Sequence, residues 1–302
     1  MNHSMSTSKS ENIILPPEVL EKLLAPIPKK ILVEKVGEQL GENESKPFKA
    51  KQSKGEYVTQ HLGQKVSLEF LREMRALHEH YNIKNFNWLL FRWDKDITNY
   101  FPELMKEQFE KVIKKLDSLI TVDFLVVDKK TKTVFLLLEN WKNEIIADAI
   151  IKRVEAKIPK YFRAYFSLSK KMLLIQERSK QATKDFLALF KQAYAVKLQE
   201  IRINAMVIRE FVKRNPKKLT KLTVKVPQEV AGFNGLSELT IVGSDVIKGS
   251  KGLMNRHETS PILIGPWVGV ANKKIELKVG ESLKTSGISH VLKLFDLITE
   301  LS

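Results

Sequence analysis

The chain contains no cysteine, which excludes disulfide bonds, thiolate zinc sites and cysteine nucleophiles. This absence fits an intracellular protein. No uninterrupted apolar run approaches the roughly 18 residues that a membrane-spanning helix needs, so we expect no membrane span. Residues 1–12 are polar and have no apolar core, so we expect no signal peptide here.

Acidic residues are scarce in one long stretch, residues 150–225, which we call the basic segment. It has 20 Lys and Arg against 5 Asp and Glu, a net charge of +15, while the whole chain of 302 residues carries +16. A solvated surface normally mixes charges of both signs, and a segment of one sign attracts polyanions. The basic segment therefore indicates either a nucleic-acid-binding surface or a lysine-rich surface that maintains solubility.

We expect DNA or RNA phosphates to contact cationic side chains of the basic segment. The candidate residues are Lys152, Arg153, Lys157, Lys160, Arg163, Arg209, Lys213, Arg214, Lys217 and Lys218. Aromatic residues lie among these cations, at Tyr161, Phe162, Tyr165 and Phe166. Exposed aromatics beside cations can stack on bases, whereas Phe162 and Phe166 at helical spacing favour a buried core.

The hydrophobic patterns predict an α+β fold, in which a central helix-flanked α/β domain with an apolar hairpin precedes a β-rich C-terminal domain. The predicted helices cover residues 67–81, 104–120, 144–158 and 182–201, and the predicted strands lie in 121–127, 133–141 and 170–177. The predicted domains are a flexible tail or linker with a short helix (1–60), an α/β domain with basic helices (61–212) and a β-rich domain with a C-terminal helix (213–302).

The two strands of the predicted hairpin are apolar on both faces except for one acid each, Asp123 and Glu139. If the hairpin is centred on Thr131, the two acids are direct neighbours on one face. A register shifted by one residue places them on opposite faces. A buried carboxylate is costly, so such groups neutralise, pair with a cation or bind a metal ion.

Two adjacent carboxylates on a sheet form a hard oxygen site suited to Mg²⁺ or Mn²⁺, which can activate water against a phosphodiester. An acid in each of two successive strands, with flanking helices, resembles the core of the PD-(D/E)XK nuclease families over residues 104–177. The resemblance implies that Asp123 and Glu139 are catalytic metal ligands. The lysine position of these families is Trp141 here, so Lys142 is the candidate catalytic lysine only if the strand bulges or has already ended.

The alternative is that Asp123 or Glu139 caps a strand end or pairs with a Lys or Arg from a covering helix. As a partner, strand parity favours the basic helix 150–158 over Lys142. Three functions stay open: nucleic-acid binding through the basic segment, a metal-dependent nuclease using Asp123 and Glu139, and a scaffold that binds an acidic protein partner. Salt dependence and polymer type separate the first from the third. Metal dependence separates the second from both.

Overall fold

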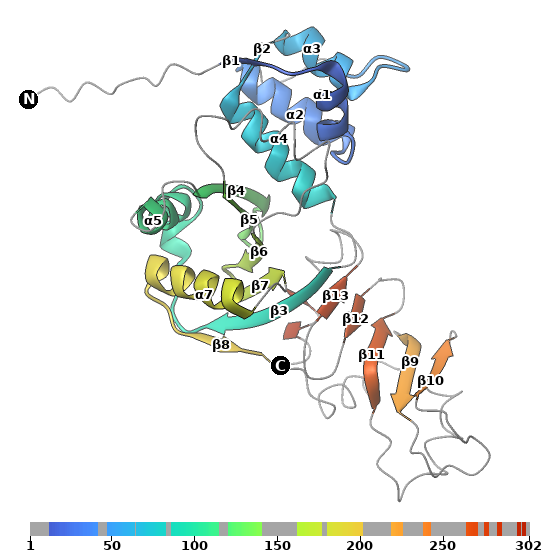
Figure 1. The fold of residues 1–302 in the computed structure, drawn as a ribbon, viewed down its shortest axis with the longest axis vertical. Helices are drawn as coiled ribbons and strands as arrows, with labels where there is room; N and C mark the ends of the chain where they lie inside the picture. The colour runs from blue at the N-terminus through green and yellow to red at the C-terminus, as the bar shows by residue number, and fades with distance from the viewer. Residues whose placement is uncertain are drawn as a thin grey trace, which may run out of the picture. The chain divides into compact units, whose positions relative to one another are not determined.

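The computed structural model describes residues 12–41, 47–63, 65–82, 86–114, 120–140, 162–176, 180–201, 219–225, 238–242, 264–270, 275–277, 283–285, 295–296 and 298–299. Its helices and antiparallel strands confirm the α+β class (Figure 1). The chain divides into two compact units, and the division passes through the strands β4 (Ile120–Asp128), β5 (Thr133–Asn140) and β6 (Phe162–Ser167). The predicted three-domain division stays a prediction.

The first unit contains helices and a two-stranded antiparallel sheet in its N-terminal part. These elements are β1 (Asn12–Ile14), α1 (Pro17–Leu24), α2 (Lys29–Leu40), α3 (Lys54–Leu62), β2 (Lys65–Ser67) and α4 (Leu68–Tyr81). The sequence predicts one short helix before residue 60, but α1, α2 and most of α3 lie there. Leu and Val side chains of these helices recur at helical spacing and are buried, which is why the helices form.

Helix α4 confirms the helix predicted at residues 67–81, with Ser67 as its N-cap. The Ser67 hydroxyl accepts a hydrogen bond from the Phe70 N–H group at 3.1 Å, which satisfies one of the unbonded donors of the first turn. The apolar residues buried by α4 include Phe70, Leu71, Met74 and Leu77. The helix also buries two charged residues, Arg75 and Glu79, which apolar spacing does not predict.

The described residues of the second unit form further strands and helices besides its parts of β4, β5 and β6. Its elements are β3 (Phe86–Trp93), the 3₁₀ turn η1 (Thr98–Tyr100), most of α5 (Glu103–Lys114), β7 (Met172–Gln176), α7 (Lys180–Tyr194), β8 (Leu198–Glu200), β9 (Leu219–Lys225), β10 (Glu238–Val242), β11 (Ile264–Val270), β12 (Ile275–Leu277) and β13 (Leu283–Thr285). Helices α5 and α7 lie side by side (Figure 1), with the rings of Phe109 and Phe186 in contact. Phe190 of α7 packs on Trp93 and Phe166, so α7 covers a face formed by β3 and β6.

The large sheet has the strand order β10-β9-β11-β12-β13-β3-β7-β6-β5-β4, and β8 pairs with β3. The predicted hairpin is confirmed as β4 and β5, with β5 between β6 and β4. The sequence missed β6, where Phe162 and Phe166 belong to a strand whose six residues are all buried. Both aromatics are core residues as expected, but their helical spacing was misleading. The predicted helix 144–158 lies outside the described residues.

No helix in the described part of the chain is both long and apolar enough to cross a membrane.

Candidate functional site

The two acids of the hairpin both reach α4, within the first unit. Asp123 Oδ1 lies 2.9 Å from Arg72 Nη2 and accepts a hydrogen bond from Arg72 Nε at 3.1 Å. Glu139 Oε1 lies 3.9 Å from Arg75 Nε, an ion-pair distance that is too long for a hydrogen bond. Because one helix contacts both carboxylates, Asp123 and Glu139 lie on the same face of the hairpin. This is the arrangement predicted for a hairpin centred on Thr131.

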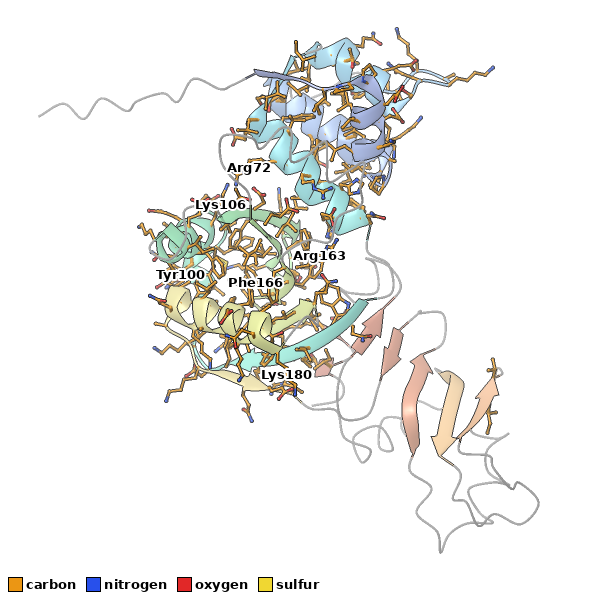
Figure 2. All side chains as sticks on the ribbon, in the orientation of Figure 1. Arg72, Tyr100, Lys106, Arg163, Phe166 and Lys180 are labelled. Atoms are coloured by element: carbon orange, nitrogen blue, oxygen red, sulfur yellow. The ribbon has the colours of Figure 1, made fainter. Side chains whose placement is uncertain are left out.

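A third carboxylate, Glu79, joins Arg75 to a further arginine, Arg163. Glu79, one turn after Arg75 on α4, places Oε1 3.0 Å from Arg75 Nη1. Its other oxygen, Oε2, accepts a hydrogen bond from Nη2 of Arg163 on β6. Arg72 and Arg163 are labelled in Figure 2 on α4 and β6. The ion pairs made by Arg72, Arg75 and Glu79, which together we call the network, therefore tie α4 to three strands.

The six side chains of this network balance in charge, with three arginines and three carboxylates. Arg75, Glu79 and Glu139 are at most 3% exposed, so their charges are almost fully removed from water. The desolvation of such charges costs about as much as their mutual attraction returns, whereas loss of one partner is strongly destabilising. The network therefore fixes the register of β4 and β5 against α4, because a one-residue slip would turn both acids away from the arginines.

The sequence left two explanations for the buried acids, pairing with a cation or binding of a metal ion. The structure shows ion pairs at both acids. The observed partners come from α4, and the helix 150–158, which the sequence favours as the cation source, lies outside the described residues. The missed residues carry a signal, because Arg72, Arg75 and Glu79 recur at i, i+3 and i+7 and so share one helix face.

Asp123 and Glu139 are also the residues of the predicted Mg²⁺ or Mn²⁺ site. Within the part of the chain that the structure describes, no three His, Asp or Glu side chains lie together in a way that could hold a metal ion. Lys142, the candidate catalytic lysine, lies outside the described residues. Metal-dependent cleavage stays a prediction, and cleavage of nucleic acid that requires Mg²⁺ or Mn²⁺ and is lost in Asp123→Asn would support it.

A buried histidine beside the network makes the stability depend on pH. Burial lowers the pKa of His80 to about 3, and its ring packs against Phe135 of β5. The unfolded chain, with a histidine pKa of about 6.5, binds more protons than the folded chain between pH 3 and 6.5. The contribution of neutral His80 to the free energy of unfolding is therefore fully present above about pH 6.5 and is lost as the pH falls toward 3. Burial also lowers the pKa of His78, which acts in the same direction.

We expect the free energy of unfolding to fall by about 2 kcal/mol between pH 7 and pH 5 through His80 alone. Urea unfolding of wild type and His80→Phe at both pH values measures this difference. The variant keeps an aromatic ring at the site and should lose most of the pH dependence. Equal pH dependence in the two proteins would show that His80 is not buried in its neutral form.

The basic segment is described in part. Arg163 is 7% exposed and ion-paired with Glu79, so it is not available to a phosphate in this arrangement. The other predicted nucleic-acid contacts lie outside the described residues, namely Lys152, Arg153, Lys157, Lys160, Arg209, Lys213, Arg214, Lys217 and Lys218. The described cations include Lys180, Lys184 and Lys191 of α7, all of which are exposed. Sequence reasoning did not single out these three.

Comparison with known proteins finds neither a family model nor a curated protein that matches this sequence.

Proposed function

We propose that the protein binds nucleic acid through phosphate contacts made by the basic segment. The observation that carries the proposal is the concentration of charge, since residues 150–225 hold +15 of the net +16. Such a segment releases condensed counterions from a nucleic acid when it binds, which favours association at low salt. The proposal places the protein inside the cell, where DNA and RNA are found.

The exposed lysines of α7 support this proposal. Lys180, Lys184 and Lys191 are four and seven residues apart, so they form a stripe on one side of the helix, which we call the α7 stripe. The stripe is roughly 16 Å long at 1.5 Å per residue. Figure 2 labels Lys180 at its first residue. Phe186, Phe190 and Tyr194 are buried, so the lysines stand on a helix that the core holds in place.

Helix α5 differs from α7 in that its exposed lysines are paired with glutamates. Its exposed lysine Lys111 lies 2.7 Å from Glu107, and Lys106 lies 4.0 Å from Glu110. Its charges therefore alternate in sign and offset one another. In α7 the single acid, Asp185, accepts a hydrogen bond from Gln181 at 2.7 Å. Among the described contacts, none of the three lysines forms an ion pair with it. The α7 stripe keeps its positive charge available to a polyanion.

The buried aromatics favour phosphate contacts over base stacking. Phe162, Tyr165 and Phe166 are at most 1% exposed, so no base can stack on them. Lysines carry point charges that suit phosphate oxygens and read no base pattern by themselves. In the described part of the basic segment, the available groups therefore favour binding that does not depend on base sequence.

The alternative partner is an acidic protein, and a competition experiment separates the two. A fluorescently labelled duplex or single strand is bound to the wild-type protein, and unlabelled nucleic acid or poly-glutamate of equal total charge is added. The proposal predicts that nucleic acid displaces the label at a concentration at least about tenfold lower than poly-glutamate. Equal or stronger displacement by poly-glutamate would favour the acidic-protein scaffold.

A further inference from the structure

Two turns of the second unit lie against each other, and most of their residues are lysines. The first joins β4 to β5 and the second joins β6 to β7. We call residues 129–132 and 168–171 the turn cluster. The Leu168 N–H group donates to the Lys132 carbonyl at 3.2 Å, and the Ser169 hydroxyl donates to the Thr131 carbonyl at 2.9 Å. These bonds hold the two turns together as one surface.

Five of the eight residues of the turn cluster are lysines, and none is acidic: Lys129, Lys130, Lys132, Lys170 and Lys171. Lys129 and Lys130 are exposed at the first turn, and the other three are half-buried. The first three lie outside the basic segment. The charge count along the chain therefore does not reveal that these three lysines lie beside Lys170 and Lys171 of the basic segment.

The backbone of the cluster places lysine at two positions that favour glycine. Lys132 and Lys171 occupy equivalent places at the ends of their turns, with φ of +47° and +52°. Glycine and asparagine are the residues that adopt this left-handed conformation at least cost. The chain has lysine at both places although glycine would cost less, and Lys51 and Ala195 outside the cluster adopt the same conformation.

Three carboxylates near the cluster reduce its charge without cancelling it. Asp128 accepts hydrogen bonds from the Lys130 N–H group at 2.9 Å and the Thr131 hydroxyl at 2.6 Å, so it stabilises the turn. The Thr98 N–H group donates to Asp96 at 2.8 Å and lowers the pKa of its carboxyl, and the nearby charges of Lys171 and Lys132 lower it further. Asp296 pairs with Lys170. None of these contacts engages the side-chain ammonium of Lys129 or Lys130.

We propose that the turn cluster is a second phosphate-binding surface of this protein, which contacts the backbone of a nucleic acid through lysines outside the basic segment together with Lys170 and Lys171 inside it. This inference rests on the proposed nucleic-acid binding. Lys129 and Lys130 make the outer contacts, while Lys132 and Lys171 hold positive charge close to the backbone of the turns. Lysine ammonium groups suit phosphate oxygens without regard to base sequence.

The test compares two double charge reversals that change the net charge equally. Lys129→Glu with Lys130→Glu alters the turn cluster, and Lys22→Glu with Lys30→Glu alters exposed lysines of α1 and α2. At about 0.15 M salt the loss of two duplex phosphate contacts should weaken binding on the order of 30-fold and reduce the salt slope by about 1.8. The control pair should stay within about threefold of wild type.

A second variant keeps the proposal testable if charge reversal disturbs the turn. Lys132→Gly with Lys171→Gly suits the left-handed backbone, so the melting temperature should be kept or raised while affinity falls. Full affinity in both turn variants, with wild-type binding intact, would overturn the turn cluster alone. A wild-type protein that fails to bind any nucleic acid would overturn the proposed function and this inference together.

Discussion

Glu79→Gln is expected to lower the free energy of unfolding by about 3–5 kcal/mol, because it removes the carboxylate that both Arg75 and Arg163 contact. The two guanidinium groups would remain in a site where Arg75 is 3% and Arg163 is 7% exposed. Removal of one charged member of a buried ion-pair network is among the most costly defects that a single substitution can create. Urea unfolding of the purified variant measures the change.

The control is the same substitution in a solvated ion pair. Glu107 lies 2.7 Å from Lys111 on α5, and both side chains are more than half exposed. Such pairs contribute little, so Glu107→Gln should change the free energy of unfolding by no more than about 0.5 kcal/mol. If Glu79→Gln behaves like Glu107→Gln, the network is not the connection between α4 and the strands that we describe.

Reversing the three charges of the α7 stripe is expected to weaken nucleic-acid binding on the order of 100-fold at about 0.15 M salt. The change is Lys180→Glu, Lys184→Glu and Lys191→Glu, and each lost duplex phosphate contact contributes about fivefold at this salt concentration. The lysines are exposed, and glutamate is a good helix former, so the melting temperature should change little. Fluorescence anisotropy with a labelled duplex measures the affinity.

A matched triple variant separates local contact from net charge. Lys22, Lys30 and Lys49 are exposed residues of the first unit, and their replacement by glutamate changes the net charge by the same amount. This control should weaken binding far less than the α7 variant. Equal losses in both variants would mean that only the overall charge matters and that the α7 stripe is not an interface.

The hairpin and α4 were predictable from the sequence because local rules decide them. The strands that carry Asp123 and Glu139 are continuous apolar runs, and Ser67 is a capping residue directly before a helical pattern. The strand β6 was not predictable in the same way. Aromatics such as Phe162 and Phe166 fit a buried strand or a helix face equally well when the run is short.

The partners of the buried acids were harder to predict than the acids themselves. Asp123 lies 51 residues from Arg72 in the sequence, and only the packing of α4 on the hairpin brings them together. The same holds for Glu79 and Arg163, which are 84 residues apart. A charged triplet on one face of an otherwise amphipathic helix was the available signal. It indicates that the helix covers a surface with charges of its own.

The most direct test of the proposed function is the salt dependence of nucleic-acid binding by the wild-type protein. Anisotropy titrations of a labelled duplex are run at a series of salt concentrations, and log affinity is plotted against log salt. Three phosphate contacts by the α7 stripe alone would give a slope of about −2.7, so we predict a slope at least this steep. A slope near zero, or no binding at about 0.05 M salt, would contradict nucleic-acid binding through the basic segment.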